Sequence, residues 1–548
     1  MTVWRGVAES LRAFGAVFAN PSLRRLQIAG LGSTLGGWVY GVGLAVYAYE
    51  VGGARLVGLL LCARWGTSAV CAPWLGLLAD RFPRRRVMVT ADLVRVVLVW
   101  LMAVLAAAGQ SFWAIFVLAV LTTIASTAFS PAQGALLPSL VRTPEELTAA
   151  NAVMNTIESV GMFAGPAFAG LLLATTSIWV VFAITAGTFL WSAACLVGVP
   201  PDSRPAEAEP TPVGSAVLEG FRAIAAHPAL RVVVGLTAAQ TFVVGAFEVL
   251  LVVVALKLLH AGSGGVGWLN VAVGVGALLG VVIVGALAGR KRLAGDLGIG
   301  VLLWGVPLAL TAVWSNLAFA LLLFGLIGLG NTLVDVAGMT LLQRSAEDEV
   351  LGRVFSVLES LVLATLAVGS LAAPALVSLL GAKAALVIVG GFLPVLLVPI
   401  WPLLRRVDAA ARIATEPLEL LRAIPMFSLL PPTVLERLAG LAAEAKVPAM
   451  AEVFAQGDRG DRFYVIAEGA ATVEVDGAES STLGPGDFFG EIALLRDVPR
   501  TATVRSVHDL RLFALERDDF IAAVTGHAPT REAAESVVAE RLPAGAAL

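Results

Sequence analysis

Long apolar runs separated by short polar loops dominate the first three quarters of the chain. A helix needs roughly 20 apolar residues to cross the hydrocarbon core of a bilayer, because its backbone groups must be satisfied within the segment. Twelve runs reach or approach that length. They fall at about 25–49, 56–79, 87–108, 112–130, 149–174, 177–199, 230–256, 266–289, 296–314, 317–340, 354–379 and 384–404. The pattern predicts twelve membrane spans.

A polar, proline-rich stretch divides these runs into two sets of six. Residues 200–212 read PPDSRPAEAEPTP, a composition typical of a flexible linker. The halves also keep traces of an internal repeat, since the stretches 144–159 and 346–360 lead into corresponding spans and both end in Glu-Ser. Glu158 and Glu359 are therefore expected to be equivalent positions of two six-helix halves.

Beyond residue 425 the hydrophobic period changes to alternation, and glycines punctuate it. Short strands are predicted at 463–466, 471–475, 501–504 and 512–515, with helices at 432–445, 517–525 and 530–541. Short strands with glycine turns favour a small β-roll. The predicted fold class is an all-α twelve-helix membrane bundle followed by an α+β β-roll.

Composition and charge support this division. The chain is 58% hydrophobic and 14% charged, which excludes an ordinary soluble protein. Residues 405–548 hold 15 Lys and Arg against 22 Asp and Glu, so 22 and 18 of the totals of 37 and 40 remain for the apolar body. The expected domains are 1–199 (first half), 200–228 (linker), 229–404 (second half), 405–424 (linker) and 425–548 (β-roll).

Positive residues gather in the short loops on one side of the predicted membrane. These are Arg24, Arg25, Arg81, Arg84, Arg85, Arg86, Arg142, Arg290, Lys291, Arg292, Arg344, Arg353, Arg405 and Arg406, whereas the other side offers Arg55, Lys257 and Lys383. Because cytoplasmic loops carry the positive excess, both termini and the β-roll are expected in the cytoplasm, with the bundle in the plasma membrane. The three cysteines lie in apolar runs without metal-ligand spacing, so no disulfide, metal or cofactor is expected.

One loop resembles the signature of the major facilitator superfamily. Gly76, Asp80, Arg81 and Arg84 stand in the run GLLADRFPRRR (76–86), between the second and third spans. The resemblance implies a transporter in which the aspartate and the basic residues form a breakable latch between two conformations. It also implies a small-molecule substrate, the lipid bilayer as partner, no enzymatic activity and no nucleic acid.

Two further stretches bear on the kind of transporter. The glycines and proline of GMFAGPAFAG (161–170) resemble an antiporter motif, although small residues four apart also serve close helix packing. Residues 20–30, 129–141 and 147–155 resemble exporters of the enterobactin efflux branch, which favours export. Span 112–130 contains no arginine, where many proton-coupled members of the superfamily carry one.

Charged residues within the predicted spans are candidates for the transport pathway, because they are costly in hydrocarbon. Arg64, Glu158, Glu248 and Asp335 have no partner on their own helix, so each is either a substrate or proton contact or half of an interhelical pair. Asp92 and Arg95 are three residues apart and are expected to neutralise one another.

The sequence GDFFGEIALL (486–495), followed by PRTATV (499–504), resembles the phosphate-binding cassette of cyclic-nucleotide-binding domains. The resemblance implies that backbone N–H groups after Gly490, with Ile492 and Ala493, and the Arg500 guanidinium hold the cyclic phosphate. Glu491 would accept from the ribose 2′-hydroxyl, and Phe489 would line the sugar and base. Thr501 occurs in both cGMP-binding and cAMP-responsive members, and cAMP is the favoured ligand. Ala449-Met450-Ala451-Glu452 departs from the family, which often has a glycine turn there.

Three functions remain open at this stage. The first is a secondary transporter, an exporter, regulated by cyclic nucleotide. The second is a membrane-anchored nucleotide sensor that has lost transport, and the third is a transporter with an assembly domain that binds no nucleotide. No nucleophile-base set, Walker loop or metal cluster points to an enzyme.

Overall fold

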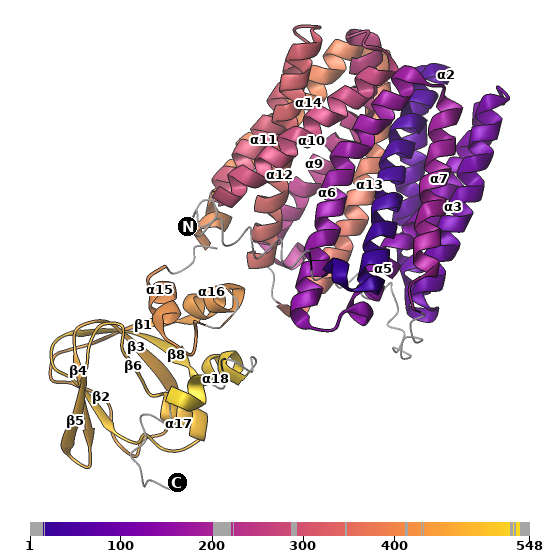
Figure 1. Cartoon of the computed structure of the whole chain (residues 1–548). Coiled ribbons are helices and arrows are strands. Elements are labelled where there is room, and N and C mark those ends of the chain that lie inside the picture. Colours follow the sequence, from indigo (N-terminus) through magenta and orange to yellow (C-terminus); the bar gives the residue numbers. More distant parts are fainter. Residues whose placement is uncertain are drawn as a thin grey trace. The chain divides into compact units, whose positions relative to one another are not determined.

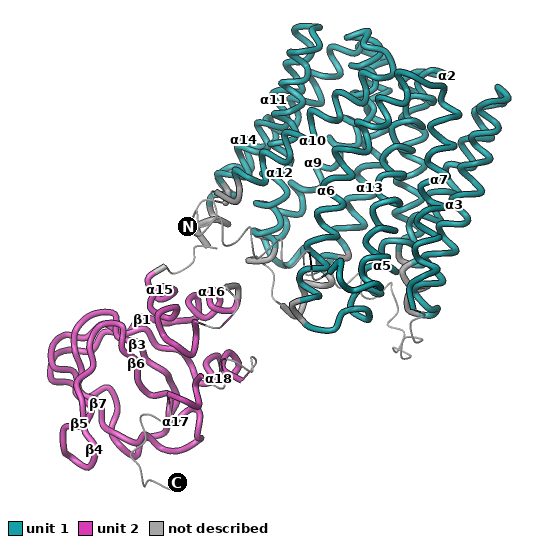
Figure 2. Tube along the Cα trace, in the orientation of Figure 1, with its two compact units in different colours: residues 1–411 teal, residues 412–548 magenta. Residues whose placement is uncertain are grey.

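The computed structural model divides the chain into two compact units, residues 1–411 and 412–548 (Figure 2). It describes residues 15, 17–200, 221–222, 224–286, 293–345, 348–410, 415–428, 430, 432–525, 530 and 533–537. Most of the predicted linker 200–228 lies outside these residues. The predicted joining segment 405–424 contains the end of one long helix and, at Thr415–Ala423, a helix that belongs to the second unit.

The first half of the first unit is a set of long apolar helices (Figure 1). They are α2 (Pro21–Arg81), α3 (Arg84–Ala107), α4 (Phe112–Thr127), α5 (Phe129–Leu140), α6 (Pro144–Thr175) and α7 (Ile178–Val197). α2 contains two spans, because its backbone leaves helical geometry at Gly52 and Gly53, where Gly53 has a φ of 63°. Tyr40 and Arg64 would lie about 36 Å apart in a straight helix. The Arg64 guanidinium instead lies 5.2 Å from the Tyr40 ring centre, so the chain reverses between them.

The second half repeats this arrangement. Its elements are α9 (Pro228–Val253), η1 (Val254–Leu258), α10 (Gly262–Ala286), α11 (Leu293–Leu310), α12 (Leu317–Ser345), α13 (Asp348–Leu380) and α14 (Ala382–Ala410). Ten helices of the described chain are long and apolar enough to cross a membrane. The first of them, Pro21–Ala72, holds two spans, and the shorter apolar helix Gly295–Leu310 adds another, so the described residues form the twelve spans that the sequence predicts.

The two halves meet along α2 with α13 and along α6 with α10. Both contacts are close near the ends of the helices that lie farthest from the loop after α2. A Cβ added to Gly170 would lie 2.7 Å from the Cα of Gly267, which shows how small residues bring α6 against α10. Ser263 donates to the carbonyl of Leu173 at 3.0 Å beside this contact. We call this end of the bundle the closed end.

Toward the opposite end, which we call the open end, the described residues of α6 lose their contact with α10. Phe163 packs against α10, because a Cβ added to Gly274 would lie 2.9 Å from the Cβ of Phe163. Residues one and two turns before Phe163 on the same face of α6 are Ser159 and Thr156, and both are exposed. The two halves therefore touch at the closed end and separate along α6 at the open end.

The second unit is a β-roll flanked by short helices (Figure 1). Its elements are α15 (Thr415–Ala423), α16 (Pro432–Leu441), β1 (Ala443–Val447), β2 (Glu452–Phe454), β3 (Arg462–Glu468), β4 (Ala471–Val475), β5 (Ala478–Leu483), β6 (Phe488–Phe489), α17 (Glu491–Arg496), β7 (Thr503–Ser506), β8 (Leu510–Glu516) and α18 (Arg517–Thr525). Two antiparallel four-stranded sheets have the orders β1-β8-β3-β6 and β2-β7-β4-β5.

Two cores hold this roll together, and neighbouring phenylalanines divide between them. Phe488 joins the cluster under the helices, which includes Phe427, Phe463 and Phe520. Phe489 points into the other cluster, between the sheets, with Ile466 and Leu512 among its members. Alternation along β6 thus places one ring in each core.

The predicted strands and the helix at 517–525 are confirmed, except that the strand expected at 501–504 runs from Thr503 to Ser506, and the helix expected at 432–445 is too long. α16 ends at Leu441, and Ala443–Val447 forms β1, which pairs along β8. Tertiary pairing overrides the helical preference of this alanine-rich stretch. Of the helix expected at 530–541, residues 530 and 533–537 are described and helical.

Candidate functional site

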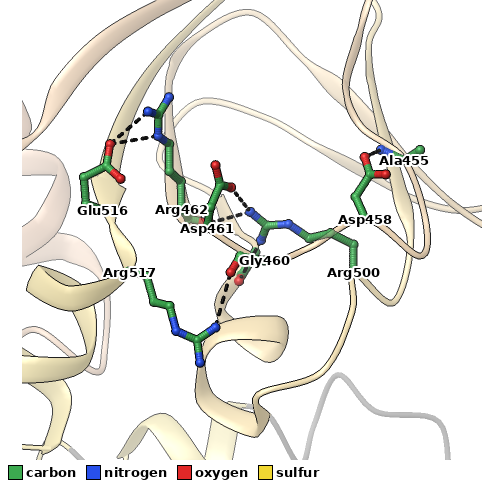
Figure 3. A network of polar contacts seen from close by, with 9 residues as sticks. Ala455, Asp458, Gly460, Asp461, Arg462, Arg500, Glu516 and Arg517 are labelled. Carbon is green, nitrogen blue, oxygen red and sulfur yellow. Dashed lines mark hydrogen bonds and ion pairs between the residues drawn. The ribbon is translucent and has the colours of Figure 1, made fainter.

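Arg500 is the central side chain of the predicted phosphate cassette. Its side chain is 2% exposed, and Figure 3 shows it among its polar partners. Nη2 donates to the Arg462 carbonyl at 2.8 Å and pairs with Asp461 at 3.2 Å, while Nη1 donates to the Gly490 carbonyl at 3.1 Å. The guanidinium also lies over the Phe454 ring, 4.1 Å from its centre. These contacts fix the orientation of a buried cation.

Two features describe the use of this cation's donors and its charge. Its Nε is buried without a hydrogen-bond partner in the described part of the chain. Burial lowers the pKa of Arg500, whereas nearby Tyr464, Asp461 and Glu491 act in the opposite direction. The guanidinium stays charged because arginine starts from a very high pKa. An anionic ligand would satisfy the free donor and offset the cost of burying the charge.

Gly490 and Glu491 form the turn that leads into α17. Gly490 has a φ of 91°, a left-handed conformation that suits glycine. A Cβ there would lie 2.6 Å from Nη1 of Arg500, so only glycine permits this close approach. Glu491 is the first residue of α17, is 1% exposed and interacts electrostatically with Arg500. The structure therefore brings the predicted acid and base of the cassette together.

The other predicted cassette residues surround this pair. Phe489 is 4% exposed and stacks on Tyr464 with 5.2 Å between ring centres. Ala493 is buried where a Cβ on Gly460 would meet it at 2.7 Å. Ile492 and Thr501 are partly exposed, at the start of α17 and directly after Arg500. Each residue predicted from the cassette thus lies in one small region of the roll.

In the bundle, Glu248 and Arg64 face one another across the two halves. Trp65, next to Arg64 on α2, donates through Nε1 to Oε2 of Glu248 on α9 at 3.0 Å. Arg64 lies close enough to Glu248 to interact with it electrostatically. Of the two roles left open for these residues, this contact supports an interhelical pair, and it joins helices from opposite halves.

Asp335 ends a chain of polar side chains in the second half. Asn331 donates to it at 2.7 Å, and the Asn331 oxygen accepts from Gln240 at 3.2 Å and from Trp304 at 3.1 Å. Gln240 and Trp304 are buried, while Asp335 is exposed. The network connects α9, α11 and α12 and holds the carboxylate at the surface of the half.

The remaining predicted residues of the bundle behave differently. Glu158 is exposed on α6. Asp92 and Arg95 form a buried ion pair, which supports the neutralising pair over a pathway role, and Arg95 lies between the rings of Phe129 and Phe189, at 4.7 and 4.4 Å. Their positions assign Asp92 and Arg95 to the core of the first half.

The loop after α2 is described in part. Arg81 is exposed and Arg84 partly buried, whereas the surroundings of Gly76 and of the Asp80 side chain are outside what the structure describes. Arg85 donates to the Val197 carbonyl at 2.6 Å, at the end of α7, and Arg25 donates to Gly198. Cations at a helix C-terminus stabilise it, so some arginines of this side have a structural role besides setting topology. The latch expected at Asp80 stays a prediction.

Several residues at these sites were not found from the sequence. Asp461 and Phe454 are distant from the cassette in sequence, and Trp65 reads as one more apolar residue of a span. Arg511 was not predicted as a site residue either, and it pairs with Glu416 on α15 and with Glu468 on β3. A pair between residues distant in sequence leaves no local signal. Only the periodicity of the predicted strands could have placed Asp461 near Arg500.

The comparison with known proteins bears first on the bundle. The sequence profile of the Major Facilitator Superfamily matches residues 26–295 and 236–448, which together cover more than half of the chain. The chain belongs to the major facilitator superfamily. The profile of the cyclic nucleotide-binding domain matches residues 444–527. This chain is therefore a multi-pass membrane protein of a transporter family that carries a cyclic nucleotide-binding domain.

Individual relatives resemble one part or the other. An uncharacterized MFS-type transporter, YfiS of Bacillus subtilis, is 27% identical over 343 residues, which are 60% of this chain and 80% of the relative. The cyclic nucleotide-gated potassium channel mll3241 of Mesorhizobium japonicum is 37% identical over 102 residues, 19% of this chain and 28% of the channel. The cAMP-dependent protein kinase regulatory subunit of Emericella nidulans is 36% identical over 102 residues, 18% of this chain and 25% of the subunit.

One solved structure also resembles the second unit in sequence. The regulatory domain of Toxoplasma gondii PKA, crystallised with cAMP, is 34% identical over 20% of this chain and 44% of its own, with a TM-score of 0.20. The chain thus spans about a quarter of the channel and kinase-subunit relatives, and less than half of this structure.

Proposed function

We propose that this protein is a secondary active transporter that exports a small molecule and whose switching is biased by cAMP binding to its β-roll. The observation that carries the proposal is the buried Arg500, with a free Nε donor, beside Glu491 and Gly490. This is the charge and geometry that a cyclic phosphate and a ribose hydroxyl require. The fused superfamily bundle supplies the transport machinery on which such a ligand would act.

Arg511 provides a route from the nucleotide site to the bundle. It lies on β8, which pairs with β3. Arg462, the first residue of β3, accepts a hydrogen bond from Arg500 through its carbonyl. The Arg511 guanidinium holds Glu416 in the first turn of α15, and the chain has four residues between α15 and the end of α14. A ligand that moves Arg500 and β3 would thereby change the constraint on α14. Binding shifts the two transporter states only if its affinity differs between them.

The positive loops support an orientation with both termini and the β-roll in the cytoplasm of a plasma membrane. In that orientation the open end of the bundle faces the cytoplasm, and the described state is ready to take a substrate from inside the cell. The transporter would then bind its substrate and cAMP on the same, cytoplasmic side of the membrane.

Titration calorimetry of the purified full chain with cAMP and cGMP tests nucleotide binding. Arg500→Ala should weaken cAMP binding by about 30-fold or more, because a buried charged hydrogen-bond donor contributes roughly 2–3 kcal/mol. Arg505→Ala is the matched control, since Arg505 lies on the next strand and makes an exposed pair with Glu452. Absence of binding by the folded wild-type chain would support the assembly-domain alternative.

A crosslink at the closed end tests regulation. The Cβ atom built on Gly264 lies 3.0 Å from that of Ala174, so Ala174→Cys with Gly264→Cys should form a disulfide in a background without the native cysteines. The Kd for cAMP should change by about fivefold or more between oxidised and reduced protein, as typical coupling energies imply. An equal Kd in both forms would exclude regulation of this step.

The sensor without transport remains the alternative, since α4 contains no arginine for a family-type proton relay. Export of fluorescent organic cations and siderophore analogues from proteoliposomes distinguishes the two. cAMP-dependent flux supports the transporter, whereas nucleotide binding without any flux supports the sensor.

A further inference from the structure

An apolar cavity of about 640 Å³ lies within the first half of the bundle, near the open end. One wall is a face of α3 that includes Val87, Val94 and Leu98, and the facing wall is α4, with Leu121 and Ala125. These residues recur every three or four positions, as the exposed faces of two helices must if they border one cleft. Its volume lies in the range of ligand sites.

This cleft lies within the first half of the bundle. All of its lining residues belong to α2, α3, α4 and the turns beside them, which are parts of the first half. The buried Asp92 and Arg95 lie on another face of α3. Val94 and Leu121 are 42% and 43% exposed, so the cleft opens along the outer, membrane-facing surface.

The mouth of the cleft differs from its walls. Arg86 stands there, exposed, and makes no hydrogen bond or ion pair within the described part of the chain. Its neighbour Arg85 is engaged at the end of α7. Phe82, also exposed, lines the same end, where aromatic rings suit the membrane interface. One end of the cleft is therefore cationic and the rest is apolar.

The length of the cleft fits one leaflet of a bilayer. Arg86 and Leu98 are twelve residues apart on α3, which corresponds to about 18 Å along the helix. Half of a hydrocarbon core is roughly 15 Å thick. A chain that enters at the level of Arg86 would therefore reach the membrane midplane at the end of the cleft.

We infer that this cleft binds an anionic phospholipid, with an acyl chain between α3 and α4 and the phosphate on Arg86. Basic pockets between membrane helices recognise anionic head groups in this way. The apolar walls exclude a purely polar ligand. The guanidinium at the mouth favours an anionic over a zwitterionic head group, since a zwitterion brings its own cation to the phosphate.

Photolabelling of the full chain in nanodiscs tests this assignment. The probes are phosphatidylglycerol and phosphatidylcholine with a diazirine in the acyl chain, each diluted in unlabelled phosphatidylcholine. Phosphatidylglycerol should label peptides containing residues 87–98 and 121–125 about fivefold more than phosphatidylcholine does, since one arginine near the surface contributes about that preference. Arg86→Gln should abolish the preference, and Arg86→Lys should keep most of it.

Two further variants separate the parts of the site. Ala125→Phe should fill the cleft and reduce labelling there by both lipids, because its side chain would occupy the acyl-chain volume. Arg55→Gln is the matched control, since Arg55 is an exposed arginine of α2 near the closed end. Equal labelling by the two lipids in the wild-type chain would overturn the head-group assignment. Labelling by both lipids that persists in a folded Ala125→Phe chain would overturn the acyl-chain site.

Discussion

Trp65 donates a hydrogen bond to the Glu248 carboxylate at 3.0 Å, and the two residues come from opposite halves of the bundle. Removing the donor of a buried hydrogen bond leaves its acceptor unsatisfied, which costs about 1–3 kcal/mol, more than a typical exposed pair contributes. Such a contact stabilises whichever transporter state contains it. Because α2 and α9 belong to different halves, it is a determinant of the balance between conformations.

Trp65→Phe should therefore shift this balance by about tenfold or more away from the described state. The measurement is the rate of disulfide formation between Ala174→Cys and Gly264→Cys, which should fall when the closed end is populated less. Trp74→Phe is the control, since Trp74 lies on the same helix and is 68% exposed. An unchanged crosslinking rate in Trp65→Phe would show that the bond does not discriminate between the states.

Asp461→Asn should strengthen cAMP binding by up to about fivefold. The Asp461 carboxylate, 63% exposed, pairs with Arg500 and competes with a phosphate for it. Exposed pairs contribute no more than about 1 kcal/mol, which limits the gain. Asp458→Asn serves as control, because Asp458 caps the Ala455 N–H and makes no contact with Arg500 through its side chain. Weaker binding by Asp461→Asn in calorimetry would mean that Asp461 orients Arg500 instead of competing for it.

Met450→Gly should stabilise the turn between β1 and β2 by about 0.5–1 kcal/mol. Met450 has a φ of 61° and is 72% exposed, in the turn where the family often has glycine. A left-handed conformation is costly for a residue with a Cβ, although glycine loses more entropy on folding. The gain should appear as slower hydrogen exchange at the amides of residues 450 and 506. The first donates to the Ser506 carbonyl and the second to the Ala451 carbonyl, so both bonds join this turn to β7.

Asp476→Gly is the matched control for Met450. Asp476 also has a positive φ, 51°, but its carboxylate accepts from Gln456 at 2.9 Å. Glycine there relieves the backbone and loses the hydrogen bond, so a smaller or opposite change is expected. Equal slowing of exchange in both variants would point to a general effect of glycine on the roll.

Glu416→Gln should release α15 from the roll and speed hydrogen exchange of its amides. Hydrogen bonding to Arg511 lowers the pKa of Glu416 below its ordinary value of 4.5. The stabilisation is therefore present above pH 4.5 and is lost as the pH falls through the lowered pKa. Exchange of α15, corrected for intrinsic rates, should thus increase in the wild-type chain only under acid conditions.

Glu419→Gln provides the comparison, since Glu419 is exposed on the same helix. It should leave exchange unchanged at neutral pH. If the two variants behave alike, the Arg511 pair does not hold α15, and another route must connect the nucleotide site to the bundle.

The sequence by itself determined the twelve spans, the division into two halves, the β-roll and the residues of the cassette. Spans follow from composition over about 20 residues, and the cassette is a continuous run in which Gly490, Glu491 and Arg500 stand near one another. Both signals are local, so no tertiary information was needed to read them.

Only the tertiary structure decided which partners these residues have. Asp461 reaches Arg500, and Trp65 reaches Glu248, through pairings that depend on how strands and helices pack, and such contacts are not encoded by spacing. The same holds for residues 443–447, which became β1 because β8 offers a partner strand. The closed end and the lipid-facing cleft likewise exist only where helices distant in sequence meet, because shape complementarity is a property of the packed helices.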